Sequence, residues 1–93
     1  MPSFRGGTVA LMSYISKTLK FPDEVCGQGR VIVEFVVEKD GRITNAIVIR
    51  SVDPTFDREA LRVIKNMPKW IPGKKNGRNV RVRFNVPVQF KLL

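Results

Sequence analysis

The stretch VRVRFNVPVQFKL at residues 80–92 decides the fold of this 93-residue chain. Its apolar residues recur at strict period two, and charged or polar residues and one proline stand between them. This alternation predicts a long β-strand with one buried face. The rest of the chain must therefore supply partner strands and a layer that covers that face. The apolar positions are Val80, Val82, Phe84, Val86, Val88, Phe90 and Leu92.

A helix is predicted upstream of this strand, at about residues 54–66. Asp53 suits the N-cap and Pro54 the first helical position, and Pro68 ends the element. Residues 70–77 then form a predicted loop. The apolar stripe of the helix is Phe56, Ala60, Val63, Ile64 and Met67, and the turn signals of the loop are Pro72-Gly73 and Asn76-Gly77.

Trp70 is the only tryptophan, and it stands where this helix meets the loop. Its neighbour Ile71 is apolar, and Pro68 and Pro72 stiffen the chain on either side. We therefore predict that Trp70 folds back over the core.

Two strands are predicted further upstream, at about residues 31–38 and 43–52, where apolar and β-branched residues are frequent. Asp40-Gly41 between them favours a two-residue hairpin turn with positive φ at both positions. The resulting register leaves apolar side chains on the uncovered face of the sheet, at Ile32, Val36, Ile47 and Ile49. The expected pairs are Lys39 with Arg42, Phe35 with Ala46, Glu34 with Ile47, Val33 with Val48 and Ile32 with Ile49.

A first helix is predicted at about residues 8–19. Leu11, Ile15 and Leu19 recur every four residues, and Thr8 is the expected N-cap. Residues 1–7 are expected to be a lead-in or linker, and residues 8–93 to form the domain.

These elements predict an α+β fold, because strands and helices mix in one short chain. The first two strands form an antiparallel hairpin, and the last strand joins the first by a crossover. The sheet is then three-stranded and antiparallel, in the order 2-1-3, with both helices on one face. The long final strand therefore lies at an edge.

A long edge strand has two interpretations. Its unpaired amides and carbonyls invite another chain, and proteins block such edges with charged residues and proline. Arg81, Arg83, Lys91 and Pro87 fit that defensive role, since proline is tolerated where no ladder donor is needed. The same edge can also accept a peptide as an added strand. The strand by itself leaves both interpretations open.

The charge is strongly positive, at +9, with 17 Lys and Arg against eight Asp and Glu. Such a charge suits a nucleic acid, an anionic membrane or an acidic protein partner. A basic nucleic-acid-binding α+β domain is the alternative function, but the exposed aromatics of a base-stacking surface are missing. We therefore expect no nucleic-acid partner. The basic residues near Trp70 are Lys69, Lys74, Lys75, Arg78, Arg81 and Arg83.

Catalytic chemistry is not expected. The chain has no His and one cysteine, Cys26, which we interpret as a small buried filler. Thiolate clusters and His-based sites are therefore ruled out, no phosphate-loop pattern occurs, and no cofactor, metal or small-molecule substrate is expected. Glu34 and Glu38 are predicted to pair with Arg81 or Arg83 on the neighbouring strand.

The order of short motifs resembles the C-terminal domain of TonB-family energy transducers. The resemblance covers about residues 4–93, although Phe21 stands where the family usually has Tyr, so a hydroxyl contact there is lost. The motifs are Phe21-Pro22, Gly29-Arg30-Val31, Phe35, Asp40-Gly41, Arg50-Ser51, Phe56-Asp57 with Ala60, Met67-Pro68-Lys69-Trp70-Ile71-Pro72-Gly73, Asn76-Gly77 and Val86-Pro87-Val88-Gln89-Phe90.

The resemblance implies a periplasmic binding domain, tethered to the inner membrane by an N-terminal segment absent from this chain. An ExbB–ExbD-like motor would supply proton motive force through that segment. The partners would be TonB-dependent outer-membrane transporters, whose TonB box binds as a strand added to the final β-strand. The implied partner-binding residues are Lys20, Phe21, Pro22, Arg81, Val82, Arg83, Phe84, Asn85, Val86, Pro87, Val88 and Gln89.

Overall fold

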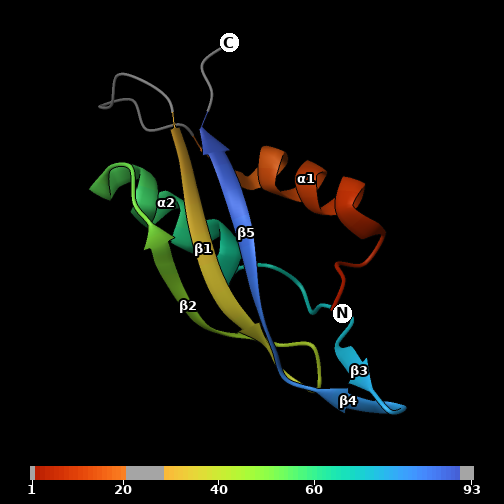
Figure 1. Cartoon of the computed structure of the whole chain (residues 1–93). Coiled ribbons are helices and arrows are strands. Elements are labelled where there is room, and N and C mark those ends of the chain that lie inside the picture. Colours follow the sequence, from red (N-terminus) through yellow and green to blue (C-terminus); the bar gives the residue numbers. More distant parts are fainter. Residues whose placement is uncertain (1, 21–28, 91–93) are drawn as a thin grey trace.

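The computed structural model describes residues 2–20 and 29–90 (Figure 1). The chain order is helix, strand, strand, helix, short hairpin, strand. The elements are α1 (Gly7–Thr18), β1 (Gly29–Val37), β2 (Ile43–Arg50), α2 (Pro54–Lys65), β3 (Gly73–Lys75), β4 (Arg78–Val80) and β5 (Val82–Phe90).

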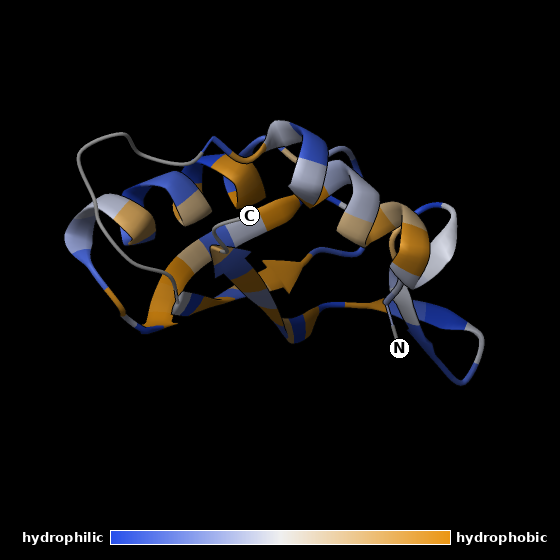
Figure 2. Cartoon of the chain, turned by 90° about the horizontal axis from the view of Figure 1, so that it is seen from above, coloured by the Kyte–Doolittle hydropathy of each residue, from blue (hydrophilic) through white to orange (hydrophobic). Residues whose placement is uncertain are grey.

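The main sheet is antiparallel, in the order β2-β1-β5. Both helices lie on one side of it, and the view from above separates the helix layer from the strand layer (Figure 2). The predicted α+β class, strand order and helix placement are therefore confirmed. β5 is at one edge, as expected.

The core forms where alternate residues of β1 and β5 face the helices. Val31, Val33, Phe35 and Val37 of β1 are fully buried. Each lies opposite an apolar residue of β5, in a register that starts at Gly29 opposite Phe90. The α2 stripe packs on these residues, and Phe56 stacks on Phe90 with ring centroids 4.3 Å apart. Burial of this continuous apolar layer is what stabilises so small a domain.

Helix α2 begins as the sequence indicates. The Asp53 carboxylate accepts a hydrogen bond from the Thr55 amide at 2.8 Å, and Pro54 follows the cap. This satisfies one of the free amides of the first turn.

The start of α1 differs from the prediction. Gly6, in the left-handed region at φ 87°, occupies the N-cap position, and no side chain caps the helix. Thr8 is inside the first turn. The segment before it, expected to be a lead-in, packs on the domain, since Phe4 is buried and Ser3 pairs with Ile71.

The β1–β2 hairpin also differs. The Gly41 amide donates to the Glu38 carbonyl, and the Glu38 amide donates to the Arg42 carbonyl, so Glu38, not Lys39, faces Arg42. Asp40 lacks the positive φ that the predicted two-residue turn requires, whereas Gly41 has φ 90°. The expected two-residue turn is therefore wrong, and a three-residue loop takes its place.

Two irregularities shift the register of strand pairing along this hairpin. One falls between Glu34 and Val36, where Asn45 on the other strand has φ 53°. It offsets the slip in the turn, so the predicted pairs of Val33 with Val48 and Glu34 with Ile47 are found. The second shift places Ile32 opposite Arg50, so the expected Ile32–Ile49 pair is wrong. Extra residues of this kind are β-bulges, which keep the apolar face inward despite the longer turn.

The predicted final strand is broken near its start. Arg78–Val80 pair with Gly73–Lys75 as a separate hairpin, so β3 lies in a segment predicted to be loop. Its turn, Asn76-Gly77, has positive φ at both positions, at 53° and 77°. The positive-φ turn predicted for Asp40-Gly41 is thus found at Asn76-Gly77 instead.

Candidate functional site

The outer edge of β5 is the first feature that can bind a partner. In the part of the chain that the structure describes, β5 pairs with β1 and with no other strand. Its residues Val86 and Val88 are buried under the helices, whereas Asn85, Pro87 and Gln89 are exposed. The strand thus combines a fixed inner side with an outer edge that carries no ladder.

Pro87 indicates which backbone groups point outward. It lies in the middle of the ladder, opposite Ile32 of β1. A proline inside a strand is tolerated where its nitrogen faces away from the partner strand. Amide and carbonyl directions alternate along a strand, so Arg83, Asn85 and Gln89 direct their N–H groups to the same outer edge. Three backbone N–H donors, and the carbonyls of the same residues, are then available at the outer edge of β5.

A small apolar hollow lies between β5 and the start of α1. Its volume is about 110 Å³, and it lies next to Phe84 of β5. An added strand would direct every second side chain towards the helix layer. One aliphatic side chain of such a strand could therefore enter this hollow. The other lining residues are Pro2, Ser3, Phe4, Gly7, Thr8, Leu11 and Trp70.

The arginines at the start of β5 and just before it are already paired. Arg81 Nε lies 2.7 Å from Glu38 Oε1, and Arg83 Nε lies 3.5 Å from Glu34 Oε1. The predicted pairing of these carboxylates with Arg81 and Arg83 is confirmed. The two arginines therefore contribute less positive charge to a partner than the sequence suggests.

The ion pair with Arg81 changes the pKa of the Glu38 carboxyl. Hydrogen bonds from Arg81, and then from the Thr44 hydroxyl, hold the pKa of the Glu38 carboxyl below its ordinary value of 4.5. Because the pKa of Glu38 is lowered in the folded domain, its carboxylate contributes to the stability of the fold above pH 4.5. This contribution is lost as the pH falls through the folded-state pKa. Because the pair is exposed, its effect on folding is small.

We predict that Arg81→Gln returns the Glu38 pKa towards its ordinary value. Removing the guanidinium removes the largest cause of the lowered pKa. The measurement is an NMR titration of the Glu38 side-chain carbonyl carbon between about pH 2 and pH 7. Arg42→Gln is the control and should move the midpoint little, since Arg42 is bound mainly to Asp40. Equal midpoints in wild type and Arg81→Gln would contradict the pairing.

The remaining predicted site residues lie elsewhere. Lys20 follows α1, and its amide donates to Glu59 of α2 at 2.6 Å, which places it beside the helix layer. Phe21 and Pro22 lie outside the described residues, as does Cys26. Arg81 to Gln89 are contiguous on one edge, with Arg81 at the junction of β4 and β5.

The uncovered face carries the expected apolar side chains. Ile47 and Ile49 of β2 are about half exposed, at 52% and 47%, whereas Ile32 and Val36 of β1 are partly buried. Single exposed apolar residues are common on proteins. No occupant of this face follows from its shape or charge.

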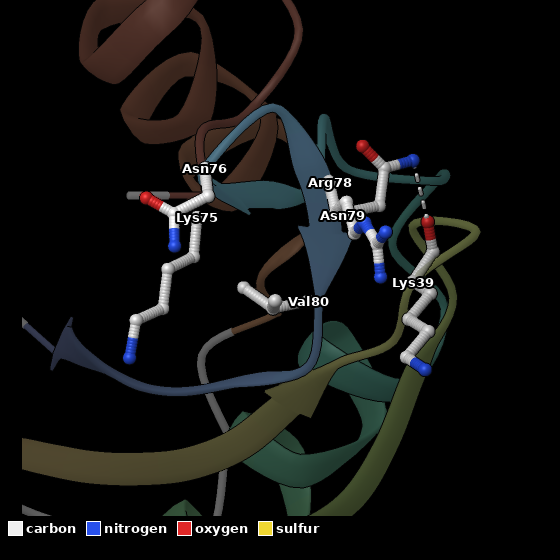
Figure 3. A pocket seen from close by; sticks show the side chains of 6 residues that line it. All are labelled: Lys39, Lys75, Asn76, Arg78, Asn79 and Val80. Carbon is white, nitrogen blue, oxygen red and sulfur yellow. Dashed lines mark hydrogen bonds between the residues drawn. The ribbon is translucent and has the colours of Figure 1, made fainter.

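The sequence did not reveal the hairpin β3–β4 as a site. It frames a hollow of about 500 Å³ together with Lys39 of the β1–β2 loop (Figure 3). The strands have three residues each and carry little apolar pattern. The signals in the sequence were the Asn76-Gly77 turn and the basic residues Lys74, Lys75 and Arg78, which were considered only as part of a nucleic-acid surface. The lining residues are Lys39, Lys75, Asn76, Arg78, Asn79 and Val80.

Two other kinds of site are not found. In residues 2–20 and 29–90, no group of three or more His, Cys, Asp or Glu could hold a metal ion. Over the same residues, neither helix has the length and apolar character needed to cross a bilayer.

Fold and site together define a class, a small α+β domain with an unpaired edge strand beside a basic hairpin. The model of the family described as Gram-negative bacterial TonB protein C-terminal matches residues 26–92. The chain belongs to this family of non-catalytic transducer and interaction domains. A search of the curated proteins finds no match.

Proposed function

We propose that this domain binds the TonB box of outer-membrane transporters as a strand added to the outer edge of β5. The observation that carries the proposal is that β5, over the described residues, has a partner strand on one side only. An added strand would satisfy outward groups at Arg83, Asn85, Pro87 and Gln89. Main-chain bonding of this kind places few demands on the partner's side chains, which suits a domain that serves several transporters.

The proposed coupling role suits the same geometry. Each main-chain hydrogen bond contributes about 0.5–1.5 kcal/mol net, so several in a row can hold a segment that is pulled. In this proposal the domain lies in the periplasm, tethered to the inner membrane by a preceding segment. An ExbB–ExbD-like motor then delivers proton motive force to the transporter through the docked strand. Lys20, Phe21 and Pro22 complete the proposed contact.

The direct test is amide mapping. A TonB-box peptide is titrated into isotope-labelled domain, and amide shifts are followed by NMR. The expected result is that the largest shifts fall on β5, above all on Arg83, Asn85 and Gln89. Largest shifts on α2, with β5 and Phe21 spared, would overturn the proposal.

We predict that Asn85→Pro weakens peptide binding without unfolding the domain. Proline removes the outward donor, and its ring obstructs the edge, while the ladder to β1 is kept. Loss of the donor alone corresponds to about two- to tenfold in affinity, and the ring adds to that. Calorimetry gives the affinity, and a thermal melt reports the fold.

Two control substitutions complete this design. Asn85→Ala removes the side chain but keeps the N–H, so binding should stay near wild type. Val86→Pro removes an inward donor from the β1 ladder and should disrupt folding. If Asn85→Pro unfolds the domain as well, the inferred outward direction of this amide is wrong. If it folds and binds normally, the added strand does not lie here.

A further inference from the structure

Several cations for which the described residues provide no ion pair lie on or beside the hairpin β3–β4, while others are spread over the helices and the main sheet. Ion pairs engage Arg81, Arg83, Arg42 and Arg62 elsewhere. In the described part of the chain, no ion pair is found for the basic residues of the hairpin and of the adjacent β1–β2 loop, namely Lys39, Lys74, Lys75 and Arg78. The largest unneutralised charge near β5 is therefore at this end.

The hollow beside the hairpin is built to take anionic groups. Figure 3 shows Lys39 and Arg78 on one side of Val80 and Lys75 on the other. Asn76 and Asn79 contribute amide groups, and Val80 contributes an apolar contact. Carboxylates with short aliphatic stems match both features, since they need cationic partners at the head and tolerate apolar surface at the stem.

The hairpin fixes the backbone that carries these side chains before any ligand arrives. Its turn has the backbone that a tight two-residue hairpin requires, with positive φ at Asn76 and Gly77. Asn79 Nδ2 donates to the Lys39 carbonyl at 3.1 Å, which ties β4 to the β1–β2 loop. A fixed arrangement reduces the entropy lost on binding.

The hairpin also lies directly before β5 in the chain. Val80 ends β4, one residue follows, and Val82 begins β5. In Figure 1 the hairpin lies beyond the start of β5, on the side away from β2. A strand rises about 3.3 Å per residue, so roughly three residues beyond the docked segment reach about 10 Å further, into this basic region.

We propose that the hairpin β3–β4 binds an acidic extension of the peptide that docks on β5, at the end of that peptide which passes Val82. This inference rests on the proposed function, and it adds the charge of the partner and the end of β5 at which that charge lies. The occupant is a run of Asp and Glu a few residues beyond the docked strand. The hairpin has no exposed aromatic residue that could stack on bases, which favours an acidic peptide over single-stranded nucleic acid.

The test compares three peptides with one apolar core that alternates at period two. One peptide has no tail, one has an acidic tail at its N-terminus, and one has the same tail at its C-terminus. Affinities are measured by calorimetry at about 50 mM and about 300 mM salt, which brackets the range where exposed charges become screened. We expect one tail position to raise affinity roughly tenfold at low salt, because each exposed ion pair contributes a factor of a few.

The hairpin variant carries Lys74→Gln, Lys75→Gln and Arg78→Gln. It should lose the gain from the tail and bind the tail-less peptide as wild type does. The matched control carries Lys17→Gln, Arg58→Gln and Lys65→Gln, which remove as many positive charges from exposed positions on the helices. It should keep most of the gain. Thermal melts check that both variants are folded.

The outcomes separate this inference from the proposed function. If the tail-less peptide binds β5 but neither tail adds affinity, the hairpin proposal is overturned and strand addition stands. Equal gains from both tails, reduced equally in both variants, mean diffuse attraction and also overturn it. If the tail-less peptide fails to bind, both proposals fall.

Binding to phosphate groups is tested in parallel, with a short DNA duplex and with vesicles of phosphatidylglycerol and phosphatidylcholine. Tighter binding of either than of the tailed peptide, lost in the hairpin variant, would identify phosphate groups as the occupant and overturn the acidic-peptide assignment. Binding weaker than about 10 µM at ~150 mM salt is ordinary for non-specific contact with nucleic acid and supports it.

Discussion

Trp70→Ala should lower the free energy of unfolding by about 3–5 kcal/mol, a large part of what a small domain possesses. The Trp70 side chain is 2% exposed. Its ring centroid lies 5.3 Å from those of Phe35 and Phe84 and 5.7 Å from that of Phe4. One ring thus joins β1, β5 and the N-terminal segment, so its removal leaves a cavity that three elements would have to fill.

The measurement is chemical denaturation followed by circular dichroism. Ile71→Ala is the matched control, because its side chain is 47% exposed and should change stability by about 0.5 kcal/mol or less. Trp70→Phe should cost less than alanine, since the buried Trp70 Nε1 has no hydrogen-bond partner among the described residues. A Trp70→Ala domain that unfolds like wild type but no longer binds peptide would make Trp70 a recognition residue, contrary to this account.

The sequence predicted the main layers because they depend on long apolar periods. The alternation at residues 80–92 identified β5 and its buried face, and the helical stripe at Phe56 to Met67 identified α2. A half-buried strand buries every second residue, and an amphipathic helix buries every third or fourth. Each further residue that fits the period therefore strengthens the prediction. The burial of Trp70 was predicted from a different signal, the apolar neighbour Ile71 and the prolines at positions 68 and 72, and it is confirmed.

Turn types could not be predicted in the same way. Asp40-Gly41 and Asn76-Gly77 both read as short hairpin turns. The first became a three-residue loop, since Gly41 packs against the backbone of Trp70, a contact between residues far apart in the sequence. Turn conformation follows such tertiary contacts as much as local preference.

The candidate site was predicted in part. The edge position of β5 followed from topology. The pairing of Glu34 and Glu38 with Arg81 or Arg83 was also predicted, but which acid meets which arginine became clear only from the structure, which pairs Arg81 with Glu38 and Arg83 with Glu34. Which cations remain unpaired depends on cross-strand register, and a one-residue shift changes every neighbour. The basic hairpin could therefore be recognised only once the strands were placed.

Gly41→Ala should cost about 2–4 kcal/mol, although it adds a single methyl group. A Cβ at Gly41 would lie 2.1 Å from the Trp70 carbonyl oxygen, a backbone atom that cannot rotate away. The Gly41 φ of 90° adds a cost of about 1–2 kcal/mol for an L-residue in a left-handed conformation. Relief of the clash would also strain the hydrogen bond from the Trp70 amide to the Gly41 carbonyl, at 2.9 Å.

Gly77 provides the control that separates these two causes. Its φ is 77°, so alanine there meets a similar backbone cost, but a Cβ at Gly77 meets no atom within 4 Å. Gly77→Ala should therefore lose only about 1 kcal/mol. Asparagine tolerates the left-handed region, so Gly77→Asn should be close to neutral, whereas Gly41→Asn keeps the clash and stays destabilising. Equal losses at the two glycines in denaturant titrations would mean that the hairpin loop yields, and that Gly41 does not lock Trp70 over the core.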